Sequence, residues 1–315
     1  MTPFFSVIIP VFNRARELEI ALRSVFAQTE RNFEVIVVDD GSVDSPESVI
    51  DALGDPRVVY VRQENRGGGA ARNAGIDCAR GRFIAFLDSD DRFLPHHLSA
   101  MRSLLEGTKG TVGYAPIIVD RGEGRTFVKP PRALGAREHM ADYLLCDRGF
   151  VPTITLVVPR SWARRVRYAE SLPFAQDTDF AIRLFLAGCR FIMAPKPSAI
   201  WNDNGCPARI SAGRKNAKLA DWLERMRGRI PARSYHGARG WILAKGVVRT
   251  RPLTALGYYL VAVLRGCYRP HLAAVILLQI YASDRFYRRM ADRLIGLRHG
   301  RIWSASACAA EPALR

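Results

Sequence analysis

Residues 87–91 (LDSDD) carry the strongest chemical signal of the chain. They follow an apolar run at residues 83–87 (FIAFL), which is typical of a buried strand. Carboxylates packed this closely repel one another, and a divalent cation removes the cost of burying them. If the strand geometry persists, Asp88 and Asp90 point to one side and can face one ion together. Such oxygen ligands suit Mg²⁺ or Mn²⁺, which usually also hold substrate phosphates. A solvated acidic turn that caps the next helix is the alternative interpretation.

Two further polar clusters also follow apolar runs. Residues 13–14 (Asn-Arg) come after residues 5–10 (FSVIIP), and residues 39–40 (Asp-Asp) come after residues 33–38 (FEVIVV). Continuous apolar runs of this length predict strands that are buried on both faces. Ligands of parallel sheets bind beyond the carboxyl ends of the strands, so one crevice can hold all three clusters.

The elements that position these clusters alternate along the first half of the chain. Further strands are expected at 58–61 and 82–87, and helices at 14–28, 44–53 and 67–78. This βαβα order predicts an α/β fold with a mostly parallel central sheet and helices on both faces. In the less regular second half we expect strands at 112–119, 153–158 and 191–194 and a helix at 176–187.

The charge of the chain is concentrated at one end. The net charge is +17, of which residues 211–315 carry +15 and residues 1–210 carry +2. We therefore predict a catalytic domain over 1–210, divided into a nucleotide-binding half (1–110) and an acceptor half (111–210). Residues 211–315 are predicted to form a basic, amphipathic helical extension.

Two apolar segments in this extension have two possible uses. Residues 253–264 and 272–280 are each too short to span a bilayer, which needs about 20 apolar residues. Arginines flank both segments, so the helices can lie in an anionic membrane interface. Alternatively, their apolar faces pack on the catalytic domain and leave a solvated basic surface.

Cysteine usage and the N-terminal residues bear on location. Six cysteines are spaced too far apart in the sequence for a metal-type pair: Cys78, Cys146, Cys189, Cys206, Cys267 and Cys308. They are interpreted as reduced thiols, and the N-terminus does not resemble a signal peptide. We expect a cytoplasmic protein that is peripheral on the inner face of the cytoplasmic membrane.

Four motifs occur in a fixed order: residues 6–14 (SVIIPVFNR), 37–42 (VVDDGS), 65–75 (NRGGGAARNAG) and 86–91 (FLDSDD). Together they closely resemble the family 2 glycosyltransferases of the GT-A fold. The resemblance is strong over residues 4–110, looser over 110–200, and does not clearly include the extension. It implies an inverting transfer of a sugar from a nucleotide donor, most simply a UDP-sugar, with Mg²⁺ or Mn²⁺ as cofactor.

The resemblance also implies roles for single residues at the donor site. The residues implied to bind the nucleotide sugar are Pro10, Phe12, Asn13, Asp39, Asp40, Arg72, Asn73, Asp88 and Ser89. Asp40 would accept a hydrogen bond from the base, as a carboxylate can from an imide N–H. Asp90 is the first choice for a metal ligand, with Asp88 as a second ligand or a contact to the ribose. Helix-capping carboxylates and a flexible glycine turn are the structural alternatives for these motifs.

The resemblance implies that Asp177 is the general base, because it takes the position of the family's catalytic aspartate. The family typically presents a Glu-Asp pair at the start of a helix, and here Gln176 replaces the glutamate. This departure puts in doubt the hydrogen bonding that orients the site. Asp179 is a competing candidate two residues away, and both aspartates are also the type of residue that a helix N-terminus favours.

The functional expectation is transfer of a sugar to a glycan or lipid-linked saccharide in cell-surface polysaccharide biosynthesis. A nucleotide-sugar-binding protein without catalysis is the first alternative. A basic nucleic-acid-binding protein is less favoured, because the basic residues flank apolar segments, so no nucleic acid is expected as a partner. A nicotinamide-dependent enzyme is least favoured, because no G-x-G-x-x-G follows the first strand.

Overall fold

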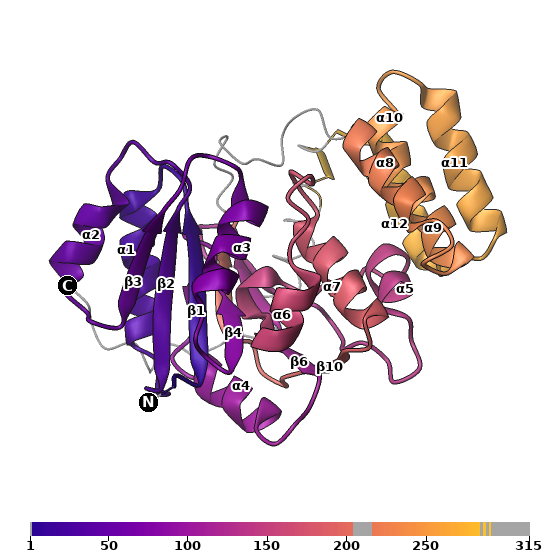
Figure 1. Ribbon diagram of the computed structural model, residues 1–315. Helices are drawn as coiled ribbons and strands as arrows, with labels where there is room; N and C mark the ends of the chain where they lie inside the picture. Colours follow the sequence, from indigo (N-terminus) through magenta and orange to yellow (C-terminus); the bar gives the residue numbers. More distant parts are fainter. Residues whose placement is uncertain (1, 204–215, 284–285, 288–289, 291–315) are drawn as a thin grey trace.

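The computed structural model describes residues 2–203, 216–283, 286–287 and 290. A seven-stranded sheet forms its centre, with strand order β10-β6-β9-β4-β1-β2-β3 (Figure 1). Its strands are β1 (Phe5–Val11), β2 (Phe33–Asp39), β3 (Val58–Arg62), β4 (Phe83–Phe86), β6 (Thr111–Tyr114), β9 (Val157–Pro159) and β10 (Arg190–Met193). All neighbouring pairs are parallel except those of β9, which runs antiparallel to β4 and β6. The predicted mostly parallel sheet is therefore confirmed.

A second, smaller sheet has the order β5-β11-β7-β8. Its strands are β5 (Arg92–Phe93), β7 (Ile117–Asp120), β8 (Thr126–Lys129) and β11 (Ala199–Asn202). The helices of the first 203 residues are α1 (Ala15–Phe26), α2 (Pro46–Leu53), α3 (Gly68–Cys78), α4 (His97–Leu105), α5 (Met140–Leu145), α6 (Arg160–Val166) and α7 (Gln176–Leu186). None of the short β5, β7, β8 and β11 strands was anticipated as part of a separate sheet.

Helices cover both faces of the central sheet. Along β1, Val7 and Ile9 belong to the core that α1 and α4 share, while Ile8 belongs to the core under α3, α6 and α7. Successive strand side chains point to opposite faces, so the continuous apolar runs are buried on both sides. Gly75 lets α3 lie directly on β1: a Cβ atom at this position would come within 2.5 Å of Ile8 Cγ2.

Two predicted strands were wrong in part. The expected strand at 112–119 is divided between β6 and β7, which belong to different sheets. Pro116 lies at the division, and proline has no N–H to donate to a ladder. The expected strand at 153–158 begins as a 3₁₀ turn, Thr153–Thr155, and only Val157–Pro159 pairs as β9. The Thr155 hydroxyl there donates to the carbonyl of Ala115, so it connects this turn to the end of β6.

The extension consists of helices that pack against one another and against the α/β part (Figure 1). It contains α8 (Asn216–Met226), α9 (Ala232–Ala238), a π-helical turn (Arg239–Leu243), α10 (Ala244–Val247), α11 (Pro252–Leu264) and α12 (Pro270–Tyr281). Trp222 and Leu223 of α8 join the core that contains Phe180 of α7, and Tyr235 of α9 joins it too. Helices α11 and α12 share a third apolar cluster with Cys146. The predicted boundary near residue 210 lies outside the described residues.

The described part of the chain contains no helix long and apolar enough to cross a membrane. Its four cysteines, Cys78, Cys146, Cys189 and Cys267, are free thiols.

Candidate active site

The polar clusters predicted from the sequence meet at the carboxyl ends of β1, β2 and β4, next to the N-termini of α3 and α7. Asp40 follows β2 and is almost fully buried. Its carboxylate accepts hydrogen bonds from Gln63 Nε2 (2.7 Å), the Arg66 amide (2.9 Å) and the Gly67 amide (2.7 Å). Asp40 therefore fixes the glycine-rich entry of α3 to the end of β2. A carboxylate can accept about four hydrogen bonds, so one acceptor position is left.

Asp39 is buried one residue earlier, at the end of β2. It accepts from the Ser42 amide and the Tyr60 hydroxyl, both at 2.8 Å, and Arg62 lies 3.5 Å away. Burial alone would raise the pKa of Asp39, but these hydrogen bonds and the Arg62 charge together hold it below its ordinary value. The same burial and the nearby carboxylate raise the pKa of Tyr60 to about 12. Asp39 thus holds the loop that follows β2 in place.

Asn13 connects the end of β1 to this loop. Its backbone N–H donates to Ser42 Oγ, and its side-chain Oδ1 accepts from the backbone N–H of Val43, both at 2.9 Å. Asn13 itself has φ +51°, in the left-handed region that asparagine tolerates. Phe12 is 44% exposed and Pro10 is half-buried, so both rings can be reached from the crevice.

A polar hollow of about 510 Å³ opens beside these loops. It is lined by Gly41, Arg62, Gln63, Glu64 and Asn65. Gly41 has φ +82°, and a Cβ atom there would come within 3.0 Å of the Asn65 amide nitrogen. A glycine is therefore needed for the two loops that line the hollow to approach each other.

Arg72 joins the third and fourth motifs to α7. Its Nη2 lies 2.5 Å from Asp88 Oδ1, and its Nη1 lies 3.0 Å from Gln176 Oε1. The third nitrogen, Nε, is buried without a hydrogen-bond partner. The glycine run makes this packing possible, because a Cβ atom on Gly69 would come within 3.0 Å of Gln176 Nε2. The glycine run therefore lets α7 lie close to the start of α3.

Asp90 lies two residues beyond Asp88 and pairs with Arg14. Arg14 Nη1 is 2.5 Å from Asp90 Oδ2, and both side chains are partly exposed. Ser89, between the two aspartates, is buried. Each carboxylate of the D-x-D turn is therefore balanced by a guanidinium rather than left to repel the other.

Few side chains at the site could coordinate a metal ion. Among the described residues no group of three or more His, Cys, Asp or Glu side chains is placed to hold an ion. Mg²⁺ is usually bound by only one or two carboxylates, with substrate phosphates and water completing its shell. Asp88 and Asp90 fit that mode, and Arg14 and Arg72 would have to release them when an ion binds.

Asp177 lies in the first turn of α7, beside this cluster. Ala175, the residue just before α7, has φ +55°, and Asp177 Oδ1 accepts from the Thr178 amide at 2.8 Å. Burial raises the pKa of Asp177, opposed by the Thr178 amide and the Arg72 charge and assisted by the nearby Asp88 carboxylate. A carboxylate with a raised pKa beside cationic groups is a candidate for proton transfer.

Two predicted or competing residues have their polar atoms engaged elsewhere. Asp179 is buried and binds Arg183 (2.5 Å) and the Trp222 indole N–H (2.8 Å), so it connects α7 to α8. The Asn73 side chain, predicted to contact the donor, donates to the Tyr168 carbonyl and Glu170 and accepts from the Tyr168 amide. Asn73 is nearly inaccessible and holds the segment at 168–170 against α3.

Tyr60, Gln63 and Tyr168 had no predicted role, and Arg14 was predicted only as part of the polar cluster at 13–14. Arg14 stands next to a predicted site residue, so its charge was the one available signal. Tyr168 lies with its ring 5.3 Å from the Arg72 guanidinium and stacks on Phe180 at 4.1 Å. Nothing in the local sequence around residue 168 indicates that its ring closes one side of this cluster.

Comparison with known sequences agrees with this geometry. The sequence model of the family described as "Glycosyl transferase family 2" matches residues 6–172. The amylovoran biosynthesis glycosyltransferase AmsB of Erwinia amylovora is 28% identical over 253 residues, which are 76% of this chain and 83% of AmsB. An uncharacterized glycosyltransferase of Rickettsia bellii is 34% identical over 190 residues, 58% of this chain but only 27% of that longer protein.

Solved structures share the fold. The Staphylococcus aureus TarS fragment 1–349 in complex with UDP-GlcNAc superposes with a TM-score of 0.62 at 18% identity, covering 95% of this chain and 93% of that one. The mannosyltransferase PcManGT of Pyrobaculum calidifontis, in complex with GDP-Man and Mn²⁺, gives a TM-score of 0.52 at 17% identity, covering 95% and 87%. These similarities establish the GT-A arrangement of the polypeptide.

Proposed function

Because the chain belongs to glycosyl transferase family 2, we propose that it is an inverting, metal-dependent glycosyltransferase whose donor is a UDP-sugar. The acceptor in this proposal is a glycan or a lipid-linked saccharide in cell-surface polysaccharide biosynthesis. Support for the pathway comes from AmsB, which is named for amylovoran biosynthesis, and support for the nucleotide comes from the UDP-GlcNAc complex of TarS. The observation that carries the proposal is the position of Asp177 beside the Arg72–Asp88 pair.

The donor would lie across the carboxyl ends of β1, β2 and β4. The hollow beside Gly41 is large enough for a base, and the remaining acceptor position of Asp40 suits an imide N–H. The exposed Phe12 ring can stack on a planar base. Arg14 and Arg72 would bind the diphosphate, because guanidinium groups match phosphate oxygens in geometry and charge.

Asp90 and Asp88 would hold the metal ion together with the diphosphate. A bound Mg²⁺ or Mn²⁺ neutralises charge that develops on a departing phosphate. The Mn²⁺ in the PcManGT complex supports this part of the proposal by analogy of fold only. The chain's own residues support metal binding as well, because both carboxylates of the D-x-D turn are partly exposed.

Asp177 is the general base of the proposal. Its carboxylate takes the proton of the acceptor hydroxyl as that oxygen forms a bond to the anomeric carbon. The bond between the anomeric carbon and the phosphate oxygen breaks on the opposite face, so the configuration inverts and the nucleoside diphosphate leaves. Base catalysis of this kind contributes roughly 10²–10⁴ in rate.

A binding protein without catalysis is the second candidate, and Gln176 is the observation that favours it. Gln176 accepts from Arg72 where the family typically carries a glutamate, so the site has one negative charge fewer. A binding protein would keep the donor hollow and the D-x-D turn and would have no use for Asp177.

A donor panel separates the two candidates. The folded protein is mixed with UDP-, GDP- and dTDP-sugars with Mn²⁺, Mg²⁺ or EDTA, and both thermal shift and nucleoside diphosphate release are measured. We expect metal-dependent stabilisation by one nucleotide, and release of its diphosphate when a saccharide acceptor is supplied. Stabilisation without release, over a broad set of acceptors, would favour the binding protein. Absence of stabilisation by any nucleotide would contradict both.

A further inference from the structure

Helix α11 is apolar on two opposite faces. Ala255, Tyr259 and Ala262 are buried against the neighbouring helices. On the other side, Leu253, Leu256, Leu260 and Leu264 recur at intervals of three and four residues and are all exposed, Leu253 and Leu264 by more than 80%. A helix with apolar residues all round is normally buried on all sides. Part of the surface of α11 therefore has no cover within the described part of the chain.

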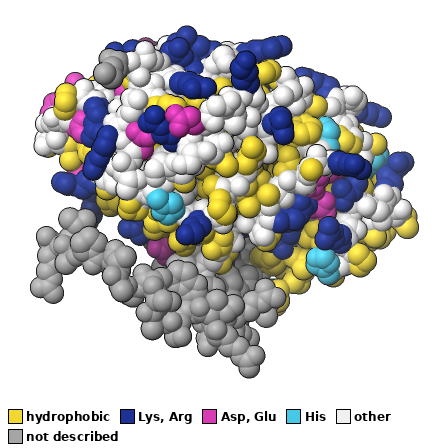
Figure 2. Space-filling view, turned by 90° about the horizontal axis from the view of Figure 1, so that it is seen from below, with side chains coloured by type: hydrophobic (Ala, Val, Ile, Leu, Met, Phe, Trp, Pro, Cys, Tyr) yellow, Lys and Arg dark blue, Asp and Glu magenta, His cyan; other side chains and the backbone are white. Residues whose placement is uncertain are grey.

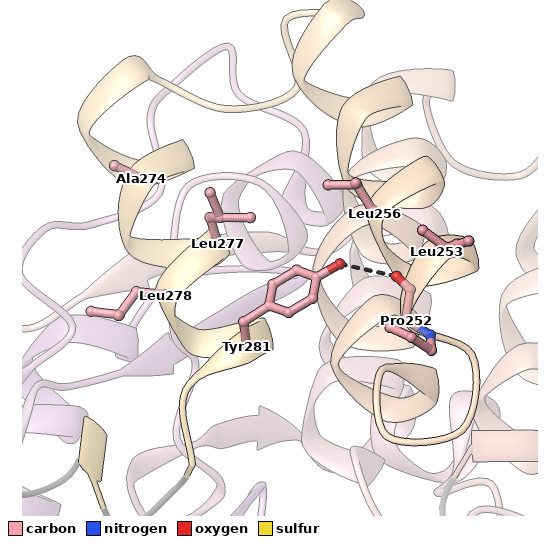
Figure 3. Close-up of a pocket in the computed structure, with 7 residues that line it drawn as sticks. All are labelled: Pro252, Leu253, Leu256, Ala274, Leu277, Leu278 and Tyr281. Carbon is pink, nitrogen blue, oxygen red and sulfur yellow. Dashed lines mark hydrogen bonds between the residues drawn. The ribbon is translucent and has the colours of Figure 1, made fainter.

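The neighbouring helix α12 continues this surface and forms a groove with it (Figure 3). The groove has a volume of about 620 Å³ and is lined by Pro252, Leu253, Leu256, Ala274, Leu277, Leu278 and Tyr281. Figure 3 shows the side chains of the two helices on both sides of the groove, with the Tyr281 hydroxyl donating to the Pro252 carbonyl at 3.0 Å. That bond ties the start of α11 to the end of α12, so the groove is held by the fold.

Exposed arginines stand at both ends of α11. Arg249 and Arg251 precede α11, and Arg265 and Arg269 lie in the connection to α12; all four are exposed. None of the four has an ion-pair partner among the described residues. Residues 225–283 contain ten Lys and Arg residues and no Asp or Glu. Lys and Arg also predominate over acidic side chains on the face shown in Figure 2.

We infer that the exposed apolar face of α11 and α12 docks on a bilayer that contains anionic lipid. The leucines would enter the acyl boundary while the arginines at both ends bind lipid phosphates. With 13 residues and a rise of about 1.5 Å per residue, α11 is about 20 Å long, too short to cross a hydrocarbon core of about 30 Å. The four arginines at the ends of α11 have no acidic partner among the described residues. Their positive charge therefore favours an anionic membrane over an apolar protein partner.

This inference stands apart from the proposed function, because it uses no residue of the candidate active site. It also joins the two interpretations of the extension that the sequence left open. The inner faces of its helices pack on the α/β part, and the outer face of α11 and α12 remains for the membrane. A protein docked in this way would be peripheral on the membrane, as expected from the sequence.

Vesicle flotation of the full chain tests the inference. We expect the protein to float with phosphatidylglycerol-containing vesicles, to remain at the bottom with pure phosphatidylcholine, and to be released at high salt. Leu253→Asp and Leu264→Asp should each weaken binding by about tenfold or more, because each removes a side chain from the acyl boundary. Both leucines are too exposed for these changes to disturb the fold. Ile20→Asp, at an exposed apolar residue of α1, is the matched control and should bind like the parent.

A second set of variants separates the charge from the apolar face. Arg251→Gln combined with Arg265→Gln and Arg269→Gln should lower binding to anionic vesicles and flatten its salt dependence. Failure of the parent to bind anionic vesicles overturns the inference, as does unchanged binding of the two leucine variants. Sedimentation of the parent as a dimer that Leu253→Asp dissociates, with no vesicle binding, would assign the face to a second copy of the chain instead.

Discussion

Arg72 and Asp88 form an ion pair with 2.5 Å between Nη2 and Oδ1, and the same guanidinium contacts Gln176 through Nη1. One side chain thereby joins the third and fourth motifs to α7. Since Arg72 Nε is buried without a partner, the guanidinium has donor capacity to spare at the point where a diphosphate would lie. In the proposed function Arg72 has two consecutive roles: it keeps the D-x-D turn in place without ligand, and it would bind phosphate when the donor arrives.

Replacing Arg72 by lysine should separate charge from geometry. A lysine ammonium keeps the positive charge but cannot contact Asp88 and Gln176 in a planar fork. Each lost charge-assisted hydrogen bond is worth about 1.5–3 kcal/mol, so kcat/KM should fall by about 10- to 100-fold. Nucleoside diphosphate binding, measured by calorimetry, should weaken in parallel. Equal affinity and rate in Arg72→Lys would show that Arg72 acts only as a local charge.

Replacing Asp177 by asparagine should remove catalysis and leave donor binding. Asparagine has nearly the same shape but cannot take the proton from the hydroxyl of the acceptor saccharide, so kcat should fall by about 10²–10⁴. The affinity for the nucleoside diphosphate should stay close to that of the parent, because Asp177 is not assigned to the donor. Asp90→Ala is the contrasting variant and should weaken metal-dependent donor binding. Full turnover in Asp177→Asn would mean that the base is another residue.

The pH profile should reflect the raised pKa of Asp177. A general base must be deprotonated, so kcat/KM should fall as pH decreases through the pKa of Asp177, which burial raises above its ordinary value of 3.8. Gln176→Glu adds a negative charge next to Asp177 and should move this acidic limb to higher pH. Gln176→Ala removes the contact to Arg72 without adding charge and serves as the control, whose limb should not move upward. An acidic limb unaffected by Gln176→Glu would contradict the assignment of that limb to Asp177.

The sequence was sufficient to locate β1, β2, β3 and β4, because each lies in a continuous apolar run with polar residues at its end. The clusters at 13–14, 39–40 and 88–91 met at one edge for the same reason. Their pairing was not predictable: Arg14 and Asp90 are far apart in the chain, and only the folded sheet brings their side chains together. Hydrogen bonds across such separations depend on packing that no local pattern records.

Asn73 and Asp179 also show that long-range contacts cannot be predicted from a local pattern. Both stand inside motifs, and both carry polar groups that suit a ligand. The folded chain uses them for its own long-range contacts, Asn73 with the segment at 168–170 and Asp179 with Trp222 of α8. Helix α8 was predicted only as part of a helical extension, without bounds. The second sheet was not predicted, because its short strands derive their stability from tertiary packing rather than from a local pattern.

Two helical glycines should respond in opposite ways to alanine. At Gly75 a Cβ atom would lie 2.5 Å from Ile8 Cγ2, so Gly75→Ala must push α3 away from β1. Overpacking of this kind costs about 1–3 kcal/mol of unfolding free energy. A Cβ atom added at Gly257 of α11 would meet nothing within 4 Å outside the backbone of its own helix, and Gly257→Ala should add about 0.5–1 kcal/mol of unfolding free energy through helix propensity. Denaturant unfolding followed by tryptophan fluorescence measures both; a stable Gly75→Ala would contradict the close packing of α3 on β1.

Glu34 should make the stability of the fold depend on pH. It lies near the amino end of β2, whereas the candidate active site lies at the carboxyl ends of the strands. It is buried on β2 and accepts from Ser6 Oγ and the Arg80 amide, both at 2.7 Å, and from Arg80 Nε at 2.8 Å. Burial alone would raise its pKa, but these hydrogen bonds and the Arg80 charge hold the pKa below its ordinary value of 4.5. A lowered carboxylate pKa stabilises the fold above that ordinary value, and the stabilisation is lost as pH falls through the folded pKa.

Glu34→Gln should therefore lower the unfolding free energy at pH 7 by about 2 kcal/mol, the size of a hydrogen bond to a charged group. The difference from the parent should shrink as pH falls below 4.5, because the parent then loses the same charge. Glu106→Gln, at an exposed glutamate just after α4, is the control and should leave the curve unchanged within about 0.5 kcal/mol. Urea unfolding at a series of pH values measures this. A difference between Glu34→Gln and the parent that stays constant down to pH 3 would mean that shape, not charge, explains the loss.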